Sequence, residues 1–445
     1  MFKDLRDHVI STESATAAQA LSHCIELFAQ RHADTGPQLQ STLEADPDCV
    51  LAQALLGLML HGARTVAFRG AIQLALEKAQ RGSASVTKRE KLYVTALKYA
   101  VAGRLEDSVR CYEAILEQHP TDLLAHVLLQ SELFWLGEMV WCERVSKPLE
   151  KFWTKELPGY PAFLAIRAFD LEETNQFAAA ESVARNALAI NPGDVWGAHA
   201  LAHVMLMQNR IDEGIAWMGE HQHHWEDANQ MQFHLAWHQC LFLGERRAHD
   251  EILNIYDTRI RNSDHALYQA MPDLYIDLQN ASSLLWRLEN TGVEVGDRWE
   301  ELAEHTTERT DDMSNAFTSA HFAMILAAAE QFDRCDYMIR SMEAFAQDAS
   351  HDLASRYEKA ALPAARAAVA HRRGDHQRVV NELGPARLEL WRMGGSHAQQ
   401  DVFHQLLADS LLTLGDASKH ASLLGEIEQI GFVEPARRVA YSAQR

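Results

Sequence analysis

The feature that most constrains the fold of this chain is a helical periodicity broken by turn residues at a regular spacing. Apolar residues recur with a helical period over nearly the whole sequence, and the alternation typical of β-strands is missing. Three predicted turns, at Asn175, Asn209 and Gly244, follow one another at intervals of 34 and 35 residues. This spacing predicts helical hairpins that repeat along the chain and stack on their neighbours.

The clearest single unit runs from Ala96 to Pro120 and resembles a tetratricopeptide repeat. Ala96 and Ser108 are the small residues that allow two helices to approach closely, and Gly103 forms the turn between them. One hairpin cannot bury its apolar face alone, so neighbouring hairpins must share a core. We therefore expect an all-α, tetratricopeptide-like solenoid of about ten helical hairpins, curled into a closed superhelix.

The sequence predicts a single continuous helical-repeat domain over residues 1–445, because no linker rich in Gly, Ser or Pro divides it. Residues 1–90 are expected to form degenerate N-terminal hairpins. Residues 91–260 contain the clearest repeats, and residues 261–445 form degenerate repeats that close the groove.

The amino-acid composition limits the classes of binding partner and the cellular compartment that we expect. The chain has 41 basic and 62 acidic residues, a net charge of −21, which disfavours binding to nucleic acid or to an anionic membrane surface. Its six cysteines form no Cys-x-x-Cys pair, which fits buried, reduced thiols. With no signal peptide and no long apolar run, the expected location is cytoplasmic. Oligomeric state is left open.

Two histidine pairs are the strongest local signal for a functional site. His199 and His203 are spaced i, i+4, and His234 and His238 repeat that spacing 35 residues later. Counted in the repeat register, both pairs occupy positions 5 and 9 of consecutive first helices, which face the groove. Packed helices lie about 8–10 Å apart, so the four imidazoles are expected to share one patch.

The same histidines can also be explained by burial, since they can satisfy backbone groups or stack on Trp196 and Trp237. The His-x-x-x-His spacing suits two metal ligands. However, Ala200 and Leu235 stand where a metalloprotease has Glu, and no further carboxylate or thiol ligand is placed by the pattern. We therefore predict no metal and no other cofactor from the sequence.

A second polar cluster, Gly394 to Asp401, opens the last repeat. Two glycines before a helix can leave backbone N–H groups free for an anion or carbonyl, although Ser396 as an N-cap would explain the motif equally well. Asp277 can cap its helix or orient a histidine, and His321 can be a satisfied core histidine. The predicted catalytic candidates are His203, His238 and Asp401. The predicted ligand-binding residues are His199, His234, Trp286, His321, Ser396, His397, Gln400 and Asp277.

Four segments together resemble the tetratricopeptide repeat protein 38 family. They begin at Trp196, Phe233, Ala281 and Gly394, and contain both histidine pairs, Trp286 and the Gly-Gly-Ser-His motif. The resemblance extends in order from about Leu51 to the C-terminus. It implies an all-helical, cytosolic repeat protein and assigns no activity.

These observations predict a binding protein with a compact, His-rich concave pocket for a small polar molecule or a peptide segment. The alternative is an enzyme of hydrolase or lyase type that uses pocket histidines and a carboxylate for general acid–base catalysis. We expect the histidine pairs and the segment from Ser396 to Asp401 to line the same cavity, and a separation of more than roughly 20 Å would contradict this expectation.

Overall fold

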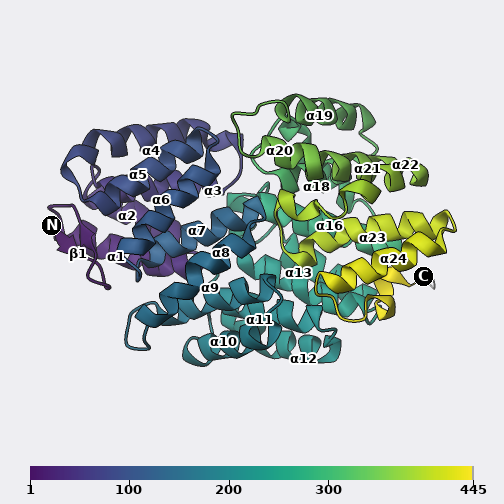
Figure 1. The fold of residues 1–445 in the computed structure, drawn as a ribbon, viewed down its shortest axis with the longest axis horizontal. Helices are drawn as coiled ribbons and strands as arrows, with labels where there is room; N and C mark the ends of the chain where they lie inside the picture. The colour runs from purple at the N-terminus through teal and green to yellow at the C-terminus, as the bar shows by residue number, and fades with distance from the viewer. Residues whose placement is uncertain (443–445) are drawn as a thin grey trace.

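The computed structural model describes residues 1–442, and its regular structure is almost entirely helical (Figure 1). The strands in this range are two residues each, β1 (Phe2–Lys3) and β2 (Val9–Ile10), and they pair antiparallel. The all-α class predicted from the sequence is therefore confirmed.

Consecutive helices pack on one another along the chain, beginning with α1 on α2 and α3 on α4. The helices of the first half are α1 (Ala15–Ala29), α2 (Thr35–Ala45), α3 (Val50–Gly62), α4 (Arg69–Gly82), α5 (Lys88–Val101), α6 (Leu105–Gln118), α7 (Leu123–Leu136), α8 (Met139–Ser146), α9 (Tyr160–Glu173), α10 (Phe177–Ile190), α11 (Val195–Met207) and α12 (Ile211–His221). Those of the second half are α13 (Met231–Gly244), α14 (His249–Ile255), α15 (Ala266–Ala270), α16 (Tyr275–Asn290), α17 (Arg298–Thr306), α18 (Ala316–Ala328), α19 (Phe332–Phe345), α20 (Ala354–Arg356), α21 (Leu362–Arg372), α22 (His376–Ala386), α23 (His397–Thr413) and α24 (Ala417–Gln429). Short 3-10 and π turns connect several of them.

The turns fall close to the predicted positions. Asn175 and Asn209 have left-handed backbone angles, with φ of 61° and 56°, a conformation that Asn tolerates better than most residues. Positive φ also occurs at the predicted turn residue Gly103. It recurs at later helix ends, at Gly137, Gly292, Glu330, Gly374 and Gly415. The turn expected at Gly244 occurs three residues later, at Arg247 with φ of 54°, because α13 extends through Gly244.

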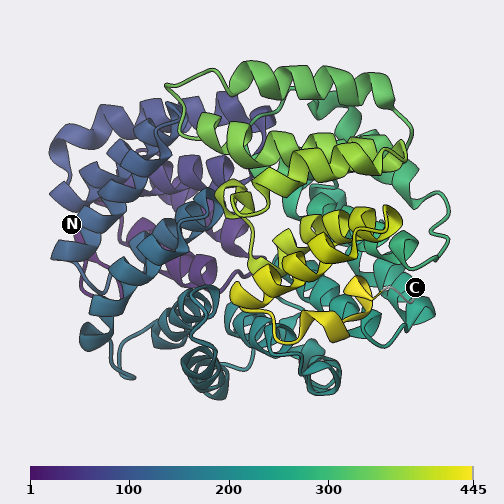
Figure 2. The same ribbon diagram turned by 45° about the vertical axis from the view of Figure 1, so that its right-hand side comes forward.

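Segments far apart in the sequence lie side by side where the first third of the chain meets the last third. The amide of Asp352 donates to the carbonyl of Gly103 at 2.9 Å, and Arg356 Nε donates to the carbonyl of Leu136 at 3.1 Å. In both ribbon views the N-terminal helices adjoin the helices around α20 (Figures 1 and 2). The buried apolar side chains of these segments belong to one continuous core that runs through most of the described chain.

The C-terminal segment, residues 430–442, runs beside helices from the middle of the sequence, which are drawn in teal (Figure 2). The amide of Val433 donates to the carbonyl of Met207 at 2.9 Å, and Arg438 Nε donates to Glu245 Oε1 at 3.1 Å. This segment therefore joins α23 and α24 to the region of α11 and α13, where the histidine pairs lie.

Two further expectations concern membranes and thiols. Among the described residues, no helix combines the length and the apolar character that a membrane span requires. All six cysteines are buried and none forms a disulfide, as the sequence predicts.

Candidate metal centre

The two histidine pairs lie on adjacent helices in the interior. α11 carries His199 and His203, and α13 carries His234 and His238, so each pair is one helical turn apart on one face. The Asp194 carboxylate caps α11 by accepting two backbone hydrogen bonds, of 3.1 and 3.0 Å. α9 packs on the other side of α11, and α16 packs on α13. Four helices therefore surround the pairs.

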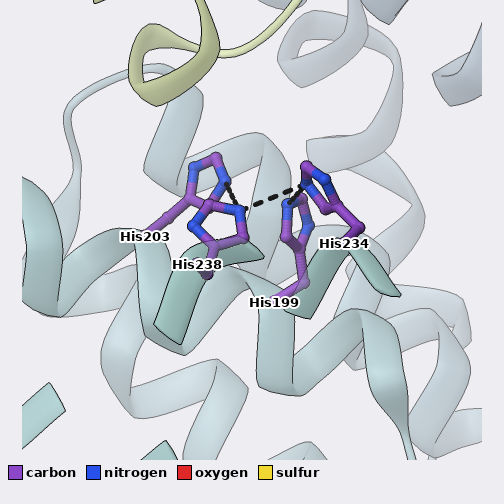
Figure 3. Close-up of side chains that lie close together, drawn as sticks. All are labelled: His199, His203, His234 and His238. Carbon is purple, nitrogen blue, oxygen red and sulfur yellow. Dashed lines mark hydrogen bonds between the residues drawn. The ribbon is translucent and has the colours of Figure 1, made fainter. Parts of the chain in front are cut away.

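The four imidazoles meet through their Nε2 atoms (Figure 3). The Nε2 atoms of His199 and His234 are 3.0 Å apart, those of His203 and His238 are 3.1 Å apart, and those of His234 and His238 are 3.2 Å apart. One ring nitrogen from each of the four lies within 4.8 Å of the others. None of the four histidines is more than 2 % exposed, so the cluster is a closed interior site.

Two of the rings are oriented by acceptors behind them. His203 Nδ1 lies 3.1 Å from Glu172 Oε2, and His234 Nδ1 lies 2.9 Å from Asn280 Oδ1. Carboxylate and amide oxygens only accept hydrogen bonds, so Nδ1 carries the hydrogen in both rings. In the neutral form of each ring, the lone pair of Nε2 then points to the centre. This is the arrangement found behind metal-bound histidines.

The other two rings have aromatic neighbours. His199 stacks on Phe169 with ring centroids 5.0 Å apart, and His238 meets Trp237 edge to face at 4.7 Å. Their buried Nδ1 atoms have no hydrogen-bond partner in the structure. Aromatic packing thus fixes the planes of these rings and leaves their Nε2 atoms facing the same centre.

Burial and charge divide the four rings into three neutral ones and one charged one. Burial lowers the pKa of His234 to about 3, and it lowers the pKa values of His199 and His238 well below the usual range. Burial also opposes a charge on His203, but the Glu172 carboxylate outweighs it and raises the pKa of His203 to about 9. At neutral pH the metal-free centre therefore presents three unprotonated imidazoles and a protonated His203 that is paired with the buried Glu172 carboxylate. A metal ion bound at His203 Nε2 would displace that proton.

One residue of the predicted Ser396 to Asp401 segment, His397, lies close to the carboxylates behind His203. His397, at the start of α23, places Nδ1 3.8 Å from Glu173 Oε2, and Glu173 Oε1 lies 3.5 Å from His203 Nδ1. α23 also packs on α11. The histidine pairs and this segment therefore lie well within the separation that the sequence hypothesis required.

The remaining polar groups of that segment stabilise their own loop. Ser396 and Gln399 form a reciprocal capping box, and Gln400 Nε2 donates to the carbonyls of Gly394 and Gly395 at 3.2 and 2.7 Å. Both glycines have positive φ, and a Cβ on Gly395 would lie 2.9 Å from a phenylalanine ring of α18. Capping and close packing thus account for the Gly-Gly-Ser motif, while a ligand-binding role for Ser396 and Gln400 stays a prediction.

Asp401 is buried, and its carboxylate anchors the C-terminal segment. Its carboxylate accepts hydrogen bonds from Gln405 Nε2 at 2.6 Å, from Arg438 Nη1 at 3.3 Å and from the Tyr441 hydroxyl. These contacts use both carboxylate oxygens. The catalytic role predicted for Asp401 stays a prediction, and its observed contacts are those of a structural ion pair.

Trp286 and His321 also contact other groups. Trp286 lies edge to face with His371, with ring centroids 5.5 Å apart. His321 Nδ1 bonds to the carbonyl of Phe317 at 2.9 Å, and burial lowers the pKa of His321 to about 4. These contacts favour the interpretation of His321 as a satisfied core histidine. Ligand binding by either residue stays a prediction.

Asp277 is buried on α16, and its Oδ1 atom has no hydrogen-bond partner. Burial raises its pKa to about 8, against the opposing charge of Arg261. Because the unfolded state then loses its proton near pH 4 while the folded state keeps it, stability falls as pH rises from about 4 to 8. We expect Asp277→Asn to remove about 2–3 kcal/mol of this fall between pH 5 and pH 7. Urea unfolding at both pH values tests this, and an equal pH dependence in wild type and variant would contradict it.

Sequence reasoning missed the residues behind the histidines, namely Glu172, Glu173 and Asn280. A signal for one of them was present. In the register that places Ala168 at position 8 and Asn175 at the turn, Glu172 falls at position 12, which also faces the groove. A carboxylate at that position of the preceding hairpin is a candidate partner for His203. No such register position identifies Asn280, because its helix follows an irregular segment.

No model of a known protein family matches the sequence. The geometry of the four-histidine cluster is therefore the basis for assigning a function.

Proposed function

We propose that this protein binds one divalent transition-metal ion, with zinc as the first candidate, through the Nε2 atoms of His199, His203, His234 and His238. The observation that carries the proposal is the convergence of these four atoms on one buried point. Imidazole nitrogen suits zinc, copper and nickel, and a closed, buried set of four protein ligands is typical of structural zinc sites. The ligand-binding function expected from the sequence is thus kept, with an ion as the ligand.

The spacing of the nitrogens supports an ion of this size. Zinc binds imidazole nitrogen at about 2.0–2.1 Å, so its tetrahedral ligand atoms lie roughly 3.3–3.4 Å apart. Three of the Nε2 pairs are 3.0–3.2 Å apart, so small side-chain movements would bring them to the required distance. Such close contacts leave no room for a polyatomic ligand between the rings.

The surroundings also support a bound cation. The Glu172 carboxylate accepts from His203 Nδ1 and supplies negative charge next to a centre that would gain two positive charges. Phe169 and Trp196 pack against His199 and exclude water from it. Four protein ligands would complete a tetrahedral sphere, as in structural zinc sites, so this centre favours binding over the hydrolase or lyase alternative.

We further propose that the helices form a tetratricopeptide-like solenoid curled into a closed superhelix, and that the chain belongs to the tetratricopeptide repeat protein 38 family. Left-handed turn residues at Asn175 and Asn209 support the repeat. Contacts between the first and last thirds of the chain, such as Asp352 with Gly103, support closure. The four motif segments support the family.

Metal analysis tests the central proposal. After chelator treatment and reconstitution, wild-type protein is expected to retain about one tightly bound zinc per chain, and Co²⁺ in its place should show the intense visible bands of a tetrahedral site. His199→Ala and His234→Ala should weaken binding by more than about 100-fold, since loss of an outer partner alone costs 10- to 100-fold.

His223→Ala is the matched control, because His223 is an exposed histidine outside the cluster. It should leave zinc content and the Co²⁺ spectrum unchanged. Circular dichroism of each variant checks that the helices are retained. Folded cluster variants that bind zinc as tightly as wild type would refute the proposal.

A further inference from the structure

A second group of metal-ligand atoms lies behind His203, on the side away from the four-histidine centre. It consists of Glu172 and Glu173, the last two residues of α9, and His397, the first residue of α23. One ligand atom from each lies within 4.8 Å of the other two. Residues more than 220 positions apart in the sequence are therefore brought to one point.

Several ligand atoms of this group lack a hydrogen-bond partner within the described residues. Glu172 Oε2 contacts His203 Nδ1, but Glu172 Oε1 is buried and has no hydrogen-bond partner among residues 1–442. Glu173 Oε1 and His397 Nδ1 are also buried without a hydrogen bond in this range, and they take part in ion pairs of 3.5 Å and 3.8 Å. Unsatisfied carboxylate oxygens in the interior carry a large desolvation cost unless a cation lies nearby.

The positive charge near the two carboxylates is small. Within residues 1–442, their ion pairs are with the imidazoles of His203 and His397, and none is with an arginine or lysine. If His203 is a neutral ligand of the first ion, it no longer neutralises the pair. Burial and the charge of Glu172 both raise the pKa of Glu173, which shows how unfavourable two adjacent charges are at this point.

We propose that Glu172, Glu173 and His397 form a second divalent-cation site, distinct from the four-histidine centre and of mixed oxygen and nitrogen ligation. Two carboxylates and one imidazole suit Mn²⁺ or Zn²⁺. Three protein ligands leave at least one coordination position for water or a substrate oxygen, as in catalytic metal sites. The His397 side chain is 19 % exposed, although its Nδ1 atom is buried.

Glu172 belongs to both groups. Its Oε2 atom orients His203, and its Oε1 atom is buried without a hydrogen bond within the described residues. The inference therefore goes beyond the proposed function, because Glu173 and His397 serve only the second site. These two residues allow the second site to be tested without removing any ligand of the first.

Mn²⁺ binding tests the proposal. Protein loaded with one equivalent of zinc is titrated with Mn²⁺, and free Mn²⁺ is followed by its electron paramagnetic resonance signal. Wild type should bind about one Mn²⁺ per chain, and Glu173→Gln and His397→Ala should each weaken this binding at least tenfold. Glu220→Gln, which changes an exposed carboxylate, should bind Mn²⁺ as wild type does.

The outcomes separate the two sites. Loss of Mn²⁺ binding in Glu173→Gln with retained tight zinc supports the second site, and the near-identical shape of glutamine keeps the test valid if His397→Ala does not fold. Loss of zinc alone in His199→Ala, with Mn²⁺ still bound, shows that the second site stands independently. Absence of Mn²⁺ binding to wild type, or equal binding to Glu173→Gln, overturns the proposal.

Discussion

Removal of zinc from the purified protein is expected to lower its melting temperature by about 4 °C. At a free zinc concentration 1,000 times Kd, binding stabilises the folded state by about 4.1 kcal/mol. Unfolding of 445 residues has an entropy of about 0.9 kcal/mol per kelvin at about 2.1 cal/mol/K per residue. The ratio of these two quantities gives the expected shift, which differential scanning calorimetry with and without a strong chelator measures.

The variant His234→Ala provides the control for this shift. It should melt at or below the temperature of the zinc-free wild type, and added zinc should leave its melting temperature unchanged. His223→Ala should show the full wild-type response, because that exposed imidazole lies outside the cluster. A wild-type melting temperature that does not respond to zinc or chelator would contradict metal binding by the folded state.

Glu172→Gln is expected to weaken zinc binding by 10- to 100-fold without removing a ligand. The Glu172 carboxylate accepts from His203 Nδ1 at 3.1 Å and supplies the negative charge behind that ring. Glutamine keeps the shape and an acceptor oxygen but loses the charge, and changes to such outer partners typically cost this much affinity. Competition with a chromophoric chelator measures the difference in Kd.

Glu173→Gln is the matched comparison, because Glu173 lies farther from His203 Nδ1, at 3.5 Å, and its other oxygen faces His397. It should change zinc affinity at the four-histidine centre by less than Glu172→Gln does. Equal zinc affinity in wild type and Glu172→Gln would show that the carboxylate does not support the metal-bound ring.

The residue pattern predicted the relation between the two histidine pairs because that relation is local. Spacing of i, i+4 places two side chains on one face of a helix, and a repeat of about 34 residues places the same face on the next hairpin. His199 and His234 occupy matching positions in that register, and the structure shows their Nε2 atoms 3.0 Å apart. The left-handed turns at Asn175 and Asn209 were predicted by the same reasoning.

The sequence did not predict the residues that contact the histidines, because those contacts depend on the distances between helices. A register states which way Glu172 and His203 face, but not how closely α9 and α11 pack. The groove positions become interior positions when α23 packs on α11, and that contact joins residues nearly 200 positions apart.

Asp401 shows where sequence reasoning of this kind stops. Its proximity to Ser396 and His397 in the sequence placed it with the functional residues. In the structure its carboxylate is held by Arg438 and Tyr441, which lie in the C-terminal segment beyond the last predicted repeat. No periodic pattern in the chain indicates that this segment returns to α23.

Zinc K-edge X-ray absorption on the Glu173→Gln variant, loaded with one zinc, tests the central claim most directly. The substitution removes the second group's competition for the ion and leaves the four histidines intact. The proposal predicts a first shell of four nitrogens at about 2.0–2.1 Å with the outer scattering of imidazole rings. A first shell that contains sulfur, or one with fewer than three imidazoles, would contradict it.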